Sequence, residues 1–194
     1  MSADSKLDSY GDLVRHYHRT LDLVSPAALA GWDRLVADAQ LYAELVEELA
    51  AGDGDLLDVG SGVGLPGIPL AIAFPERTVH LVERRRRRSA FLNLACGHLK
   101  LDNVQVHHGD VAELTDIKAA VVTAQAVGRF ASIHGLTRSL QAGKVLLVSS
   151  KGPDWQDEAA ELEEVLGSGL LASGVRERRN GNGLVVGLLF AGGQ

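Results

Sequence analysis

Hydrophobic residues recur along the first fifty positions at the spacing of amphipathic helices. A period near 3.6 residues indicates a helix, and it is clearest in Leu35, Val36, Ala39, Leu45, Val46 and Leu49. Ser25 followed by Pro26 is typical of a helix start, because serine caps free N–H groups and proline tolerates the first helical position. We therefore expect a helical N-terminal extension over residues 1–52, ending at the glycine-rich break 51–54.

Beyond this break, short apolar strands alternate with helices. The pattern predicts strands over 56–59, 78–82, 104–107, 120–123 and 144–149, and helices over 67–74, 86–99, 131–140 and 154–166. Strands 174–179 and 184–190 should form a hairpin around Asn180-Gly181-Asn182-Gly183. Such alternation predicts an α/β fold, Rossmann-like, with a seven-stranded, mostly parallel sheet and a C-terminal antiparallel hairpin. Residues 53–194 should form this domain as a single compact unit.

Three glycines follow the first predicted strand directly. Gly60, Gly62 and Gly64 suit a tight turn where a ligand approaches the backbone. Asp58 precedes them, and its carboxylate can hold the positively charged ammonium of S-adenosylmethionine (SAM), directly or through water. Glu83 ends the second strand and can accept hydrogen bonds from both ribose hydroxyls. We therefore predict a class I SAM-dependent methyltransferase domain.

Two other interpretations of the glycines stay open. The same segment matches the dinucleotide pattern Gly62-x-Gly64-x-x-Gly67, which is weak evidence alone, and Asp58 would repel the pyrophosphate of NAD. A glycine turn without any ligand is the second. Asp110, after the third strand, either lies beside the adenine or only forms a turn.

Composition narrows the class of protein. The chain has 194 residues, 46% of them hydrophobic, and one cysteine, which excludes an internal disulfide and favours a reducing cytoplasm. We expect no membrane span and, because the histidines lack suitable partners, no metal. A net charge of −6 argues against general nucleic-acid binding. The exception is the run of five arginines from Arg84 to Arg88, which can bind phosphate locally.

The segment from Leu57 to Leu70 is more specific than its glycines. It reads LDVGSGVGLPGIPL and closely resembles the bacterial RsmG family, also called GidB. The resemblance continues through the arginine run and residues 99–104. It implies SAM-dependent methylation of a guanine N7 in 16S rRNA of the small ribosomal subunit. It also implies a cofactor site; with the residues argued above, the expected set is Asp58, Gly60, Ser61, Gly62, Gly64, Leu65, Glu83, Asp110, Val111 and Ala112.

The RNA side of the site departs from the family pattern. Gln125 stands where the family has an arginine after the fourth strand, and Arg129 is the nearest substitute. The family's N-terminal Trp-Asn and Asn-Leu-Thr motifs are replaced by other residues over 21–24. We expect RNA contacts from basic residues around the site, namely Arg84, Arg85, Arg87, Arg88, Arg129 and Lys151.

The expected chemistry needs no catalytic side chain. Guanine N7 carries an in-plane lone pair and no proton, so an enzyme has only to align it with the methyl group and exclude water. Two alternatives remain at this point: a methyltransferase for small molecules, and a module that binds SAM or RNA without turnover. We expect a monomer.

Overall fold

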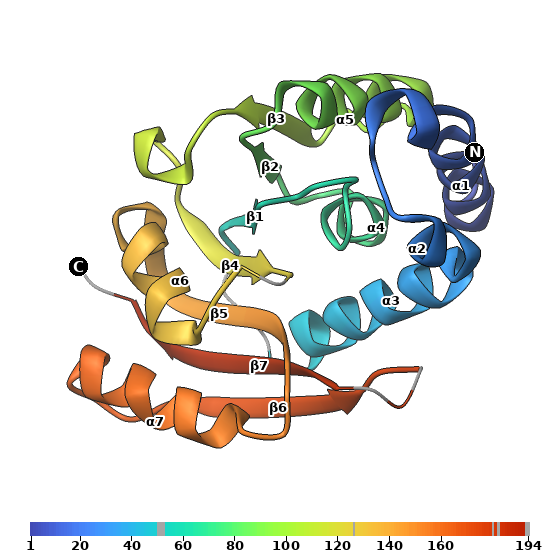
Figure 1. The fold of residues 1–194 in the computed structure, drawn as a ribbon. Helices are drawn as coiled ribbons and strands as arrows, with labels where there is room; N and C mark the ends of the chain where they lie inside the picture. Colours follow the sequence, from blue (N-terminus) through green and yellow to red (C-terminus); the bar gives the residue numbers. More distant parts are fainter. Residues whose placement is uncertain (50–52, 126, 180, 182, 193–194) are drawn as a thin grey trace.

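The computed structural model describes residues 1–49, 53–125, 127–179, 181 and 183–192 (Figure 1). Its centre is a seven-stranded sheet in the order β3-β2-β1-β4-β5-β7-β6. The strands are β1 (Asp55–Val59), β2 (Val79–Glu83), β3 (Val104–His108), β4 (Ala119–Ala124), β5 (Gln141–Lys151), β6 (Ala172–Glu177) and β7 (Leu184–Ala191).

Strands β1 to β5 pair in parallel, whereas β7 pairs antiparallel with both β5 and β6. This confirms the predicted mixed sheet and its C-terminal hairpin. Because β1 lies between β2 and β4, the chain order reverses beside β1. In open α/β sheets, ligands bind at the carboxyl ends of the strands at such a reversal. The topology therefore puts the loop after β1 at the expected binding edge.

Helices cover both faces of the sheet (Figure 1). The helices are α1 (Ala3–Leu21), α2 (Pro26–Ala30), α3 (Trp32–Glu48), α4 (Gly67–Ala73), α5 (Arg86–Leu99), α6 (Phe130–Thr137) and α7 (Trp155–Leu166). Two short 3-10 turns, η1 (Val111–Glu113) and η2 (Arg138–Leu140), complete the fold. Helix α6 is shorter than the predicted 131–140 because its last turn tightens into η2.

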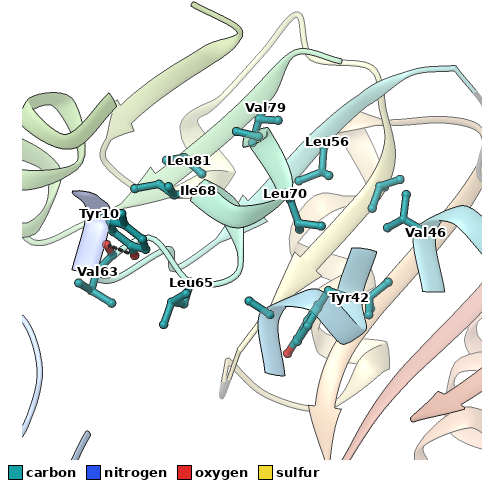
Figure 2. Close-up of a cluster of buried hydrophobic side chains, with 14 of the residues drawn as sticks. Tyr10, Tyr42, Val46, Leu56, Val63, Leu65, Ile68, Leu70, Val79 and Leu81 are labelled. Atoms are coloured by element: carbon teal, nitrogen blue, oxygen red, sulfur yellow. Dashed lines mark hydrogen bonds between the residues drawn. The ribbon is translucent and has the colours of Figure 1, made fainter. Parts of the chain in front are cut away.

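The three N-terminal helices confirm the helical prediction, and they are built into the sheet's core. Figure 2 shows Tyr10 of α1 beside Ile68 of α4, with Tyr42 of α3 and Leu56 of β1 in the same cluster. All four side chains are almost completely buried in one hydrophobic cluster. The cap expected at α2 is present, since Ala28 N donates to the Ser25 hydroxyl at 3.1 Å. The N-terminal segment therefore stabilises the face of the sheet that carries α4 and α5.

The C-terminal hairpin is tied to α3 by a buried carboxylate. Asp38 accepts hydrogen bonds from Arg178 Nε at 2.8 Å and from the Arg179 backbone N at 2.9 Å. Two residues of the predicted turn, Asn180 and Asn182, lie outside the described residues. The pairing fixes the hairpin against a helix more than a hundred residues earlier in the sequence.

Candidate cofactor site and adjacent basic surface

The loop after β1 adopts a backbone conformation that favours glycine. Gly60 and Gly62 have φ angles of +70° and +59°, in the left-handed region. A Cβ on Gly60 would also lie 3.2 Å from Val127 Cγ2. Ser61 N donates to Val82 O at 2.9 Å, which joins the loop to β2. Local strain and close approach therefore both explain why glycines occupy this turn.

Glu83 fixes the loop from the end of β2. Its Oε2 accepts from Gly62 N at 2.9 Å, and its Oε1 accepts from Arg85 N at 2.7 Å. The side chain is buried. A carboxylate offers about four acceptor positions, so both oxygens keep capacity for a ligand's hydroxyl groups. Glu83 thus holds the loop and remains able to bind a diol.

A cavity of about 150 Å³ opens at the carboxyl ends of β1, β2 and β4. Five of the predicted site residues line it: Gly60, Glu83, Arg84, Asp110 and Val111. The remaining lining residues were not among the predicted site residues; they are Val59, Val82, Gly109, Val127 and Leu136. The cavity therefore combines one carboxylate-rich wall with apolar surface, as a nucleoside site requires.

Val127 and Leu136 supply apolar surface from beyond β4. Leu136 is 43% exposed, unusual for a large aliphatic side chain, because it stands at the cavity rim. Both residues follow β4, whose carboxyl end meets that of β1. Proximity to the end of β4 could have indicated Val127, whereas Leu136 lies inside α6, where the sequence carries no such signal.

Asp110 both forms a turn and lines the cavity. Its side chain accepts from Ala112 N at 3.1 Å, which caps η1. Its Oδ2 lies 3.7 Å from Arg84 Nη1. The two alternatives open at the sequence level are therefore compatible. Ala112 is exposed and is not among the residues that line the cavity.

Asp58 lies beneath the glycine loop, away from the cavity lining. It is 1% exposed, and its Oδ1 accepts from Thr123 Oγ1 at 2.7 Å. Its Oδ2 is buried with no hydrogen-bond partner among the described residues. Burial raises the pKa of this carboxyl to about 6, although the bond from Thr123 opposes the shift. Asp58 is therefore too deeply buried to contact a ligand in the cavity directly.

Four other predicted cofactor residues also build the loop without lining the cavity, and one of them is Gly62, whose backbone N donates to Glu83. The Ser61 hydroxyl donates to Asp58 O at 2.9 Å. Gly64 is packed so closely that a Cβ would lie 2.6 Å from Ile68 Cδ1. Leu65 is buried in the core shared with α4. These contacts hold the loop backbone in place beside the cavity.

The arginine run passes from the cavity onto the first turn of α5. Arg84 is exposed at the cavity rim. The side chains of Arg85, Arg86 and Arg87 are exposed and have no ion-pair partner in the described part of the chain. Arg88 is half-buried, and its Nη2 donates to Asp22 O at 3.3 Å. Apart from the contact between Arg84 and Asp110, the run therefore forms a positive surface without ion pairs among the described residues.

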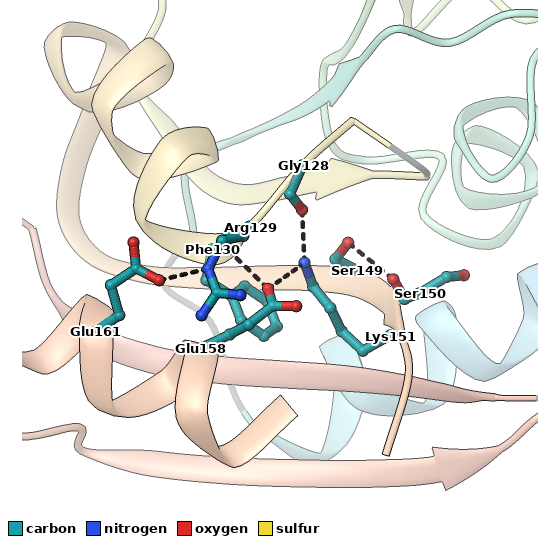
Figure 3. A network of polar contacts seen from close by, with 8 residues as sticks. All are labelled: Gly128, Arg129, Phe130, Ser149, Ser150, Lys151, Glu158 and Glu161. Carbon is teal, nitrogen blue, oxygen red and sulfur yellow. Dashed lines mark hydrogen bonds and ion pairs between the residues drawn. The ribbon is translucent and has the colours of Figure 1, made fainter. Parts of the chain in front are cut away.

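Lys151 does not lie at the surface where an RNA phosphate would meet it. Its side chain is 4% exposed, and its Nζ donates to Gly128 O at 2.6 Å and to Glu158 Oε2 at 2.7 Å (Figure 3). It also lies 4.4 Å from the centre of the Phe130 ring. These contacts use the ammonium internally, so Lys151 holds the loop between β4 and α6 in place.

Gln125 and Arg129 lie in that same loop. Gln125 directly follows β4 and is half-buried. Arg129 pairs with Glu161 of α7 while about half of its side chain stays exposed (Figure 3). Arg129 is thus an exposed guanidinium close to the cavity residue Val127. Phe130, the residue after Arg129, is buried.

Among the described residues, no group of three or more histidine, cysteine or acidic side chains is arranged to hold a metal ion. His80 and His107 lie close together, with ring nitrogens 2.9 Å apart, and His80 also contacts Asp55. In the part of the chain described, no helix has the length and apolar character needed to cross a membrane.

Comparison with known proteins identifies the family of this chain. The family described as "GidB: rRNA small subunit methyltransferase G" matches residues 3–172. The chain belongs to this family. A relative from Halorhodospira halophila with the name ribosomal RNA small subunit methyltransferase G is 34% identical, over 83% of this chain and 75% of its own length. A relative of the same name from Sorangium cellulosum is 42% identical over 70% of this chain and 58% of its own length.

Solved structures support the fold only. The O-methyltransferase of Bacillus cereus has a TM-score of 0.65 and 12% identity, covering 94% of this chain and 91% of its own. TYW2 of M. jannaschii has a TM-score of 0.63 and 17% identity, covering 81% and 76%. The match to the rRNA small subunit methyltransferase G family is wider than the resemblance visible in the sequence, because it includes α1, α2 and α3.

Proposed function

We propose that this chain transfers a methyl group from SAM to N7 of a guanine in 16S rRNA of the small ribosomal subunit. The observation that carries the proposal is one shared cavity. Its wall is the glycine loop held by Glu83, and its rim begins the arginine run at Arg84. Membership of the rRNA small subunit methyltransferase G family supports the same reaction.

The residues present fit SAM. Glu83 would accept hydrogen bonds from the ribose hydroxyls, and Val111, Val127 and Leu136 would surround the adenine. The glycine loop would lie against the methionine part, whose ammonium is favoured by the buried, unpartnered carboxylate oxygen of Asp58. When bound, SAM supplies a methyl group on a positively charged sulfur.

The chain's own task is to position the base. Guanine N7 has a free lone pair, so no side chain has to remove a proton before transfer. Holding the two reactants in line supplies a large part of the rate enhancement in such reactions. The carboxylates of Glu83 and Asp110 are already engaged by backbone N–H groups, which suits positioning better than acid–base chemistry.

RNA would be held mainly through its phosphates. Arg84, Arg85, Arg87 and Arg88 would contact the backbone, with Arg129 on the opposite side of the cavity. Phosphate contacts of this kind give affinity that falls steeply with salt. We further propose that the enzyme works as a monomer in the cytoplasm, where the ribosomal subunits are.

The test is transfer of labelled methyl from SAM to small subunits that lack this modification, followed by mapping of the labelled base. We expect label on one guanine N7 of 16S rRNA. The triple variant Arg85→Gln/Arg86→Gln/Arg87→Gln should bind RNA more weakly and with a shallower salt dependence. Arg138→Gln is the control, because Arg138 is an exposed arginine in η2, directly before β5, and lies outside the arginine run.

Two results would contradict the proposal. Label on a small acceptor but never on the subunit would identify a small-molecule methyltransferase. SAM binding in a calorimeter without transfer to any ribosomal particle would identify a binding module without turnover.

A further inference from the structure

A second hollow lies at the C-terminal end of α1, outside the cofactor cavity. Its volume is about 600 Å³, within the range of ligand sites. Arg15, His18 and Arg19 line it from α1. Val24 and Leu29 line it from the connection to α2 and from α2 itself. We call this hollow the α1 groove; its remaining lining residues are Asp22, Pro26 and Ala30.

The α1 groove is continuous with the arginine run. A smaller hollow of about 210 Å³ is lined by Arg85, Arg86, Arg87 and Arg88 together with Asp22. Asp22 also lines the α1 groove, so the two hollows meet at this residue. Helix α1 packs against α5, as Figure 1 shows. The basic surface therefore extends from the cofactor cavity across α5 to the end of α1.

Arg88 connects this surface to the glycine loop. Its Nη2 donates to Asp22 O at 3.3 Å. Its Nη1 lies 3.8 Å from the position that a Cβ on Gly62 would take. One side chain therefore spans the distance between the loop and the residue shared by the hollows. A polymer in the cofactor cavity would need to extend only a short way to enter the α1 groove.

Most of the positive charge here has no partner. His18 and Arg19 have no carboxylate within 4.0 Å among the described residues, as is also true of Arg85 to Arg87. Arg15 has only long contacts to two exposed carboxylates, at 3.3 and 3.5 Å. The arginines at the start of α5 also oppose its helix dipole, and no acidic residue stands in its first turn. Such a surface fits a polyanion.

We propose that the α1 groove binds an unpaired nucleotide of the RNA substrate, adjacent to the nucleotide that enters the cofactor cavity. Single-stranded RNA is held by bases stacked on histidine or arginine side chains and by phosphate contacts. His18 and Arg19 supply both kinds of contact, and Val24 and Leu29 supply apolar surface for a base. The proposal rests on the proposed function, because it concerns how the same RNA is held.

The decisive variant is His18→Ala/Arg19→Gln, compared with Arg138→Gln. Two measurements apply: anisotropy of a fluorescent, short uridine oligonucleotide over a range of salt, and methyl transfer to small subunits. We expect about tenfold weaker oligonucleotide binding, since one stacked base is lost, and a salt slope smaller by roughly 0.7 for the lost phosphate contact. KM for subunits should rise with kcat and SAM affinity unchanged, and Arg138→Gln should behave as wild type.

The outcomes separate this proposal from the function it rests on. If wild-type enzyme methylates subunits and the groove variant is unchanged in both measurements, the groove proposal is wrong and the function stands. If wild-type enzyme methylates nothing, the function fails, while loss of oligonucleotide binding in the variant would still support the groove. If the variant binds the oligonucleotide normally but not the subunit, the occupant is a ribosomal protein and the proposal is wrong.

Discussion

The hydroxyl of Tyr10 donates a hydrogen bond to the backbone oxygen of Val63 at 2.9 Å, inside the protein. This single contact joins the first helix to the glycine loop across 53 positions of sequence. Tyr10 is completely buried, and its ring packs edge-on against that of Trp32, with 5.1 Å between the ring centres. The N-terminal helices therefore support the cofactor loop directly.

Tyr10→Phe should destabilise the protein by about 1–3 kcal/mol, because the Val63 oxygen loses its buried donor. SAM affinity should fall several-fold as the loop loosens. Urea unfolding and calorimetry measure the two effects. Tyr17→Phe is the matched control, since the Tyr17 hydroxyl has no hydrogen-bond partner among the described residues. Equal effects of the two substitutions would contradict this role for Tyr10.

Glu83→Gln should weaken SAM binding by roughly tenfold or more, because hydrogen bonds to a charged acceptor each contribute about 1.5–3 kcal/mol. The amide also turns a donor toward the N–H of Gly62 or Arg85. Calorimetric titration with SAM measures the loss. Glu76→Gln, at an exposed position before β2, should leave the affinity unchanged. An unaltered affinity in Glu83→Gln would place the ribose elsewhere.

The raised pKa of Asp58 predicts that the stability of the protein depends on pH. Its pKa is raised from 3.8 to about 6 by burial, so the folded state holds this proton more tightly than the unfolded state. The resulting stabilisation is complete below pH 4 and is lost as pH rises through about 6, a change of about 3 kcal/mol. Asp58→Asn should remove that dependence, so the two proteins should differ in the pH profile of urea unfolding.

The raised pKa of the Asp58 carboxyl also predicts how SAM binding changes with pH. Only ionised Asp58 favours the ammonium of SAM, and a pKa of about 6 leaves about a tenth of it ionised at pH 5. SAM affinity should therefore rise about tenfold from pH 5 to pH 7 in the wild type. Asp58→Asn should show weaker and flatter binding, and a parallel rise in both proteins would exclude Asp58 as the cause.

Lys151→Met distinguishes a positioning role from a phosphate contact. The substitution leaves the mostly buried Glu158 without its cation, which should cost about 3–5 kcal/mol of stability. Methyl transfer should fall because Gly128 O also loses its donor. The salt dependence of RNA binding should stay as in the wild type. A shallower salt dependence in the variant would instead indicate that Lys151 contacts a phosphate directly.

The strands and helices followed closely from the sequence because their signals are local. The period of apolar residues marked α5 as 86–99, the residues that the structure assigns. The glycines with Asp58 and Glu83 likewise indicated the loop and its cofactor. The lining residues Val127 and Leu136 and the internal pairing of Lys151 could not be predicted, because each depends on contacts between separate elements.

The α/β alternation, the glycine loop and the resemblance to one family could all be predicted from the amino-acid sequence, because each depends on residues that are close together in the chain. Which of the predicted residues contact one another depends on the three-dimensional fold. It placed Glu83 on the backbone of Gly62, buried Asp58 beneath the loop and turned Lys151 inward. Burial and charge pairing depend on which strand ends lie side by side, because the order of the strands in the sheet determines which side chains become neighbours.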